Sequence, residues 1–208
     1  MRALPLTLLL TFGAPALAGE PAPKTEKAGE VRLEHITPPK VPDEVLLDQD
    51  GREVHLASEL LHERVVAVNF VFSTCSTICS PMSAVFGKLR TELGAAVGKD
   101  VHLVSLTLDP VTDTPEKLQK FSSLFKRGKG WTFVTGEPQR MTRALKALGG
   151  WVPNKETHTP MTLIGNTSTG KWVRVFGMPT TQRLKEALVE VGATLPGPRQ
   201  PLRTQETK

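Results

Sequence analysis

Strand-like and helix-like patterns of apolar and polar residues alternate along most of this chain. Runs of apolar and β-branched residues, typical of strands buried on both faces, occur at 65–72 and 101–109, and a further strand is predicted at 131–136. Shorter alternating runs predict β-hairpins at 45–60, around Asp50-Gly51, and at 161–177, around NTSTG. Apolar residues recur at helical spacing at about 81–97, 113–125, 137–149 and 180–191.

The order of these elements indicates the fold class. It runs hairpin, strand, helix, strand, helix, strand, helix, hairpin, helix, which predicts an α/β domain with a mainly parallel central sheet, helices on both faces and a terminal antiparallel hairpin. This is the element order of a thioredoxin-like fold with an extra N-terminal β-hairpin. In such a domain, chemistry gathers at the carboxyl ends of the strands.

The two ends of the chain differ in composition from this domain. Residues 1–18 have the basic start, short apolar stretch and small-residue end of a secretory signal peptide, which predicts export to a periplasm and cleavage. Residues 19–41, rich in Pro, Lys and Glu, predict a flexible tether, and residues 196–208 predict a disordered tail. The thioredoxin-like domain is expected at 42–195, with no membrane span left after cleavage.

The basic charge of the chain does not favour a nucleic-acid partner. The 26 Lys and Arg residues exceed the 21 Asp and Glu residues, for a formal net charge of +5 at pH 7. Only KRGKG (126–130) forms a short cluster, so the remaining basic residues are better interpreted as solvated surface. Export also argues against nucleic acid as a partner.

The only two cysteines, Cys75 and Cys79, lie in FSTCSTICSPM, between a predicted strand and a predicted helix. In an extended chain their positions would be roughly 13 Å apart. In a helical turn they rise by only about 6 Å and share one face, which suits a disulfide or two thiolates on one metal ion. A structural disulfide across so short a loop would contribute only about 2 kcal/mol. A redox-active pair, or a pair of thiolates that binds one metal ion, is therefore favoured, because a helix start stabilises thiolates.

A metal site built on two cysteines needs at least one further ligand, and His158 is the best placed of the five histidines. It lies in NKETHTPMTLIG, in a loop that a thioredoxin-like fold brings beside the cysteine turn. Two thiolates and one imidazole suit copper, because thiolates favour Cu(I) and imidazole also accepts Cu(II). Zinc competes, but structural zinc usually takes four protein ligands, and the sequence offers no convincing fourth. Met82 could add a thioether, although Met more often fills core gaps.

Three motifs in order give the chain a family resemblance. They are VNFVFSTCSTICSPM with its C-x-x-x-C, SLTLDPVTDTPEKLQKF with D-P-x-x-D-T-P, and THTPMTLIGNTSTGKWVRVFG with a histidine before the last hairpin. From about Val41 to Val191 the chain resembles the Sco/SenC family of thioredoxin-like copper chaperones. The resemblance implies copper ligation by Cys75, Cys79 and His158. It also implies a partner, the copper A subunit of cytochrome c oxidase or another periplasmic copper protein.

Some positions depart from the family pattern. Many members have proline directly after each cysteine, whereas Ser76 and Ser80 stand there in this chain. Many have aspartate just before the histidine, whereas Thr157 here removes a carboxylate that would orient the imidazole. In the D-P-x-x-D-T-P motif, either Asp113 or Thr114 is expected to cap the following helix.

Two functions remain open from the sequence. The leading hypothesis is a periplasmic copper metallochaperone that holds Cu(I) or Cu(II) and delivers it to the copper A site of cytochrome c oxidase. The alternative is a thiol–disulfide oxidoreductase in which Cys75 and Cys79 are the catalytic redox pair, served by a thiol–disulfide reductant. A peroxiredoxin-like peroxidase is disfavoured, because no T-x-x-C setting with a nearby arginine is found.

Overall fold

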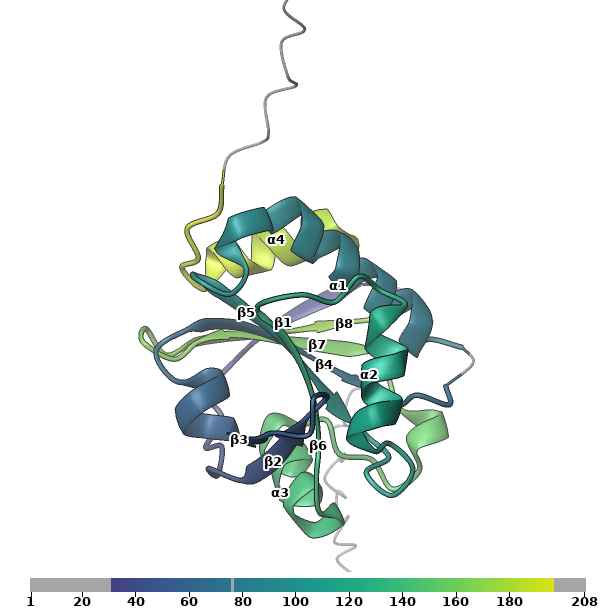
Figure 1. The fold of residues 1–208 in the computed structure, drawn as a ribbon. Helices are drawn as coiled ribbons and strands as arrows, with labels where there is room; N and C mark the ends of the chain where they lie inside the picture. Colours follow the sequence, from purple (N-terminus) through teal and green to yellow (C-terminus); the bar gives the residue numbers. More distant parts are fainter. Residues whose placement is uncertain (1–30, 76, 197–208) are drawn as a thin grey trace, which may run out of the picture.

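Eight strands form one sheet in the part of the chain that this computed structural model describes, residues 31–75 and 77–196 (Figure 1). Their order across the sheet is β1-β8-β7-β4-β5-β6-β2-β3. They are β1 (Arg32–Ile36), β2 (Val45–Asp48), β3 (Glu53–His55), β4 (Val65–Val71), β5 (Val101–Thr107), β6 (Trp131–Thr135), β7 (Met161–Asn166) and β8 (Lys171–Phe176). Strand β4 is buried at every position, as its unbroken apolar sequence predicts.

The expectation of a mainly parallel sheet is wrong, because most pairings in the described sheet are antiparallel. Only the β4–β5 and β5–β6 pairs are parallel. Strand β7 runs antiparallel beside β4 and continues into the β7–β8 hairpin. The N-terminal hairpin joins the same sheet through an antiparallel β2–β6 pair. The thioredoxin-like α/β class and both predicted hairpins are confirmed.

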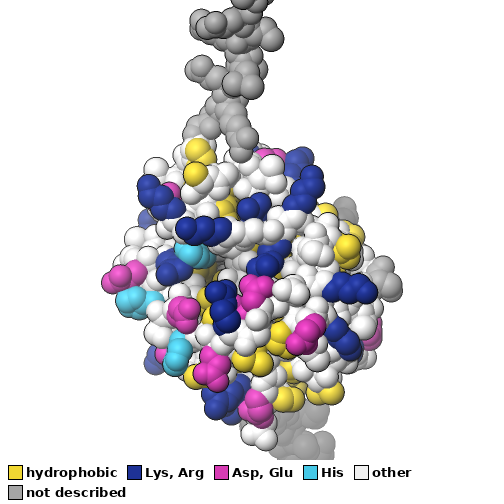
Figure 2. Space-filling model, viewed as in Figure 1, with side chains coloured by type: hydrophobic (Ala, Val, Ile, Leu, Met, Phe, Trp, Pro, Cys, Tyr) yellow, Lys and Arg dark blue, Asp and Glu magenta, His cyan; other side chains and the backbone are white. Residues whose placement is uncertain are grey.

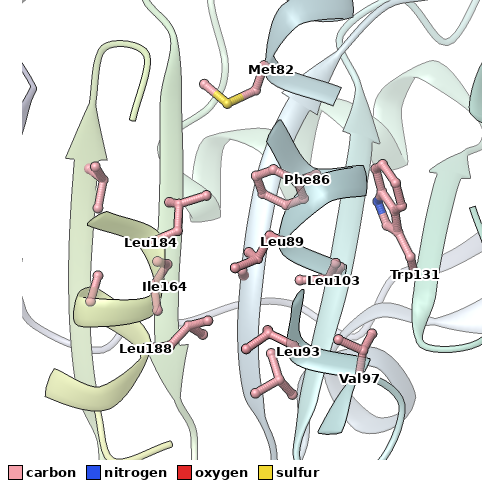
Figure 3. Close-up of a cluster of buried hydrophobic side chains, with 14 of the residues drawn as sticks. Met82, Phe86, Leu89, Leu93, Val97, Leu103, Trp131, Ile164, Leu184 and Leu188 are labelled. Carbon is pink, nitrogen blue, oxygen red and sulfur yellow. The ribbon is translucent and has the colours of Figure 1, made fainter. Parts of the chain in front are cut away.

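Helices cover both faces of the sheet (Figure 1). The helices are α1 (Cys79–Leu93), α2 (Pro115–Ser123), α3 (Pro138–Leu148) and α4 (Thr181–Glu190), with short turns η1 (Leu56–Leu61), η2 (Gly94–Ala96) and η3 (Lys155–Thr157). Side chains of α1, α2 and α4 share one buried cluster, and those of α3 and η1 share a second. Figure 3 shows Phe86 of α1 between Leu184 of α4 and Trp131 of β6. This packing fixes α1, and therefore its cysteine-bearing end, on the sheet.

Strand β1 was not predicted, since its residues fall in the segment expected to be a tether. It pairs antiparallel with β8, placing Leu33 opposite Val175. Nε2 of His35 also lies 2.9 Å from a carboxylate oxygen of Glu190 in α4. Five residues are too short a pattern to reveal a strand whose hydrogen-bonding partner lies about 140 positions away in the chain.

Several expectations concern residues that lie outside the described part of the chain. These are the signal peptide (1–18), the tether as far as residue 30, and residues 197–208 of the tail. Within the described residues, no helix is both long and apolar enough to span a membrane.

We predict that Gly165→Ala lowers the free energy of unfolding by about 1–3 kcal/mol, because the added methyl group overpacks the sheet. Gly165 lies opposite Trp172 in the β7–β8 pair, and a Cβ there would lie 2.1 Å from Cδ2 of that indole. Urea denaturation measures the loss. Gly136→Ala is the control, because its nearest neighbour is the flexible end of Leu46 at 3.1 Å. Equal losses in the two variants would contradict the steric account.

Candidate metal centre

The two cysteines lie together where the chain leaves β4 and enters α1. The backbone N–H of Cys75 donates to the carbonyl oxygen of Phe72 at 3.1 Å, which turns the chain back after the strand. Cys79 is the first residue of α1, and its N–H donates to the Sγ of Cys75 at 3.4 Å. Both cysteines are free thiols. The first sulfur therefore receives an amide hydrogen bond at the start of a helix, a position that favours thiolate.

The two thiols have different environments. Burial would raise the pKa of the Cys75 thiol, but hydrogen bonds from the Cys79 thiol and from the backbone N–H groups of Thr77 and Cys79 outweigh it and lower that pKa. Burial raises the pKa of Cys79, and the neighbouring Cys75 sulfur and Asp113 carboxylate add to the rise. Cys75 is 8% exposed and Cys79 1%. The pair thus combines an outer, more acidic thiol with an inner thiol that keeps its proton.

The carboxylate of Asp113 anchors the loop that leads to the cysteines. It is fully buried and accepts hydrogen bonds from the backbone N–H of Ser73 at 3.1 Å, from the Ser73 hydroxyl, and from the Thr107 hydroxyl at 2.5 Å. The expected helix cap is Thr114, whose Oγ1 accepts from the N–H of Lys117 at 3.4 Å. Asp113 is therefore not the cap of α2. Its carboxylate instead links the end of β5 to the residues after β4 by hydrogen bonds, and one of these residues, Ser73, lies two positions before Cys75.

His158 follows the short turn η3, close to the end of β4. Its Nδ1 lies 2.7 Å from the carbonyl oxygen of Lys155. A carbonyl only accepts, so Nδ1 carries the proton, and in the neutral imidazole Nε2 keeps its lone pair for a metal. The imidazole packs edge-on against the ring of Phe72, with 5.9 Å between ring centroids. A backbone carbonyl thus orients this histidine, since the preceding residue, Thr157, has no carboxylate to do so.

An ion pair beside His158 was not predicted from the sequence. Nζ of Lys155 lies 2.5 Å from Oδ2 of Asp109, in the loop after β5. Burial would raise the pKa of Asp109, but the hydrogen bond and charge of Lys155 lower it below its ordinary value. The same hydrogen bond raises the pKa of Lys155. Lys155 and Asp109 are distant in sequence, and no local pattern links them.

The structure brings the two cysteines together but does not group His158 with them. Among the described residues, no three His, Cys, Asp or Glu side chains are arranged so that they could hold a metal ion. Phe72 links the two parts of the site, because its ring contacts His158 and its carbonyl accepts from Cys75. Met82 is 4% exposed, and its sulfur lies 3.9 Å from the Thr162 hydroxyl, as suits a core residue.

The family follows from the sequence match. The SCO1/SenC family model matches residues 39–176, more than half of the chain. The chain belongs to the SCO1/SenC family. The matched range includes Cys75, Cys79 and His158, whereas β1 and α4 lie outside it. The family resemblance predicted from the three motifs is confirmed.

Individual relatives support the assignment of the chain to this family. The SCO1 protein homolog of Bacillus subtilis is 38% identical over 93 residues, which cover 44% of this chain and 47% of the relative. A Stutzerimonas stutzeri protein named for copper binding is 31% identical over 118 residues, 56% of each chain. The matched part thus spans about half the length of these curated relatives. A solved Sco-family structure, described as containing a disulfide switch, has a TM-score of 0.59 and 27% identity over 75% of this chain and 96% of its own.

We predict that Asp113→Asn lowers the free energy of unfolding by about 1–3 kcal/mol, because its amide leaves one buried hydroxyl or amide donor without an acceptor. Urea denaturation measures the change. Thr114→Ala, which removes only the cap of α2, is the control and should cost about 1 kcal/mol. An Asp113→Asn variant no less stable than Thr114→Ala would contradict the anchoring role.

We predict that iodoacetamide modifies Cys75 faster than Cys79 in the reduced protein, because Cys75 is more exposed and has the lower pKa. Thiolate is the attacking form, so the Cys75 rate should rise with pH and level off at a lower pH than that of an ordinary thiol. Peptide mass mapping over time measures both rates. In urea the two rates should converge, and faster modification of Cys79 in the folded protein would refute the assignment.

Proposed function

We propose that this protein is a periplasmic copper metallochaperone that delivers copper to the copper A site of cytochrome c oxidase. The observation that carries the proposal is the pair of adjacent free thiols at the end of β4, one of them holding an amide hydrogen bond on its sulfur. Two such sulfurs at a helix start are suited to bind a soft metal ion. Membership of the SCO1/SenC family and the relative named for copper binding support the choice of copper.

Cys75, Cys79 and His158 are the ligands in this proposal. The two sulfurs supply soft ligands that suit Cu(I), and Nε2 of His158 adds a nitrogen ligand that Cu(II) also accepts. The lowered pKa of Cys75 favours its thiolate, whereas Cys79, whose pKa is raised, must lose its proton as copper binds. Because His158 stands apart from the cysteines in this structure, its loop has to move toward them to complete the set.

Transfer then proceeds by ligand exchange. A thiolate or imidazole of the acceptor displaces one ligand at a time, so copper is not released free. Both cysteines must be reduced to hold copper, so a Cys75–Cys79 disulfide would prevent binding and a thiol–disulfide reductant would restore it. The solved relative belongs to a family described as cytochrome c oxidase assembly proteins, which supports the oxidase as acceptor.

The face of the protein seen in Figure 2 gives no reason to prefer nucleic acid as a partner. In the face seen in Figure 2, Lys and Arg side chains are spread among Asp and Glu side chains over several elements. The acceptor in this proposal is therefore a protein with its own copper ligands, met in the periplasm after cleavage of the predicted signal peptide.

A thiol–disulfide oxidoreductase is the second candidate, and the unequal thiols favour it. An outer thiol of lowered pKa can attack a disulfide, and a buried neighbour can then resolve the mixed disulfide. In this function Cys75 is the nucleophile and Cys79 the resolving cysteine. His158 would have no direct part in the exchange.

We predict that the reduced protein retains about one Cu(I) per chain against a competing chelator, and that Cys75→Ser or Cys79→Ser weakens binding by more than about a hundredfold, since each removes a thiolate ligand. His158→Ala should weaken Cu(II) binding strongly while leaving the rate of disulfide exchange nearly unchanged. Chelator competition and paramagnetic resonance measure the copper complexes, and reduction of a model disulfide measures exchange.

His102→Ala is the matched control for the histidine. His102 is also partly buried, but it pairs with Arg64 at the opposite end of β5 from the loop with Asp109. Its replacement should leave both copper affinities unchanged. Unaltered Cu(II) affinity in His158→Ala would favour the oxidoreductase, and failure of the wild type to retain copper would exclude the chaperone.

A further inference from the structure

The loop that carries His158 is tied to the loop after β5 by a single ion pair. Lys155 opens the turn η3, and its ammonium meets the Asp109 carboxylate at 2.5 Å. The two side chains are 31% and 10% exposed, so the pair is only partly screened by water. The ammonium also lies 5.4 Å from the ring centroid of Phe72, the ring against which His158 packs.

Asp109 belongs to a rigid part of the molecule. Its N–H donates to the Thr107 hydroxyl at 2.9 Å, and that hydroxyl donates to the buried carboxylate of Asp113. Asp113 in turn holds Ser73, beside the cysteines. Lys155 therefore attaches the histidine turn to the same framework that positions the cysteine turn.

Apart from this ion pair and the ring of Phe72, the turn η3 is held by short-range hydrogen bonds. The N–H groups of Thr157 and His158 donate to the carbonyls of Asn154 and Lys155, at 3.1 and 3.4 Å. The Asn154 side chain accepts from the N–H of Glu156, and its backbone carbonyl accepts from the Thr157 hydroxyl, both at 3.0 Å. Each residue from Lys155 to Thr157 is at least partly exposed. Since the carbonyl of Lys155 also orients the imidazole at 2.7 Å, movement of this residue moves His158.

We propose that Lys155 is a positioning residue: through its ion pair with Asp109, it holds His158 apart from Cys75 and Cys79 until the pair opens. This inference rests on the proposed copper function. It adds that the Lys155–Asp109 pair regulates when the third ligand, His158, can reach the metal. With the pair closed, only the two cysteine sulfurs are available, and as thiolates they suit Cu(I). Recruitment of the imidazole, which Cu(II) needs more, requires the pair to open, so the ion pair lowers affinity for Cu(II) relative to Cu(I).

Two substitutions that break the same pair test this inference. Lys155→Met and Asp109→Asn should each tighten Cu(II) binding by about tenfold, within the usual range of coupling between sites, and leave Cu(I) affinity unchanged. A purely electrostatic effect on a bound cation predicts opposite signs, because Lys155→Met removes a positive charge and Asp109→Asn a negative one. Opposite signs, weaker Cu(II) binding in both variants, or no change would overturn the proposal.

A double-mutant cycle shows whether the effect acts through the imidazole. In a His158→Ala background, Lys155→Met should no longer change Cu(II) affinity. Lys155→Arg keeps the positive charge and so the ion pair, and its Cu(II) affinity should equal that of the wild type. Lys185→Met is the matched control, because Lys185 is also 31% exposed and pairs with Glu92 at 2.9 Å, 13 residues along α1 from Cys79. A Lys155→Met effect that persists without His158 would overturn the positioning role.

A measurement without copper separates this inference from the proposed function. In the reduced, metal-free protein, amide hydrogen exchange at Thr157 and His158 should accelerate about tenfold in Lys155→Met and Asp109→Asn, because the turn loses its attachment. Lys185→Met should leave these amides unchanged. Unaltered exchange in the first two variants would overturn the positioning role even if copper binds, whereas accelerated exchange in a protein that retains no copper would refute the proposed function alone.

Discussion

The buried carboxylate of Asp113 is the interaction on which the geometry of the site depends. A carboxyl group is costly to bury unless its oxygens are hydrogen-bonded, and here the donors come from Ser73 after β4 and Thr107 at the end of β5. The carboxylate therefore fixes the ends of two adjacent strands relative to each other. The cysteine turn leaves from one of these ends, and the loop that contains Asp109 leaves from the other.

The same geometry suits both uses proposed for the cysteine pair, metal binding and disulfide chemistry. Cys79 begins α1, whose apolar face is fixed on the sheet by Phe86, so the inner sulfur cannot move far. Cys75 lies on the turn before the helix, where backbone N–H groups of Thr77 and Cys79 stabilise its thiolate. A rigid inner thiol and a more acidic outer thiol can close on a metal ion or on each other. In the proposed function, which event occurs depends on the redox state of the compartment, because a disulfide has no thiolate to offer a metal.

Local patterns predicted the elements better than their pairing. The apolar run of β4 and the Pro115 start of α2 follow from short-range rules, and both formed close to the expected residues. The direction of β7 beside β4 could not be predicted, because it depends on contacts between residues about 100 positions apart. Strand β1 and the Lys155–Asp109 pair escaped prediction for the same reason. The two cysteines could be placed together, since their spacing is local, whereas the distance of His158 from them depends on long-range packing.

The residue before the histidine, Thr157, has no carboxylate, which determines what controls the imidazole. A carboxylate before the histidine would orient the imidazole through its own side chain, independently of the turn. Here the carbonyl of Lys155 performs that role, so the orientation of His158 depends on the backbone of η3. The side chain of the same lysine is held by Asp109. One residue therefore orients the imidazole through its backbone and restrains its loop through its side chain, which couples the proposed third ligand to the Asp113 framework that holds the cysteine turn.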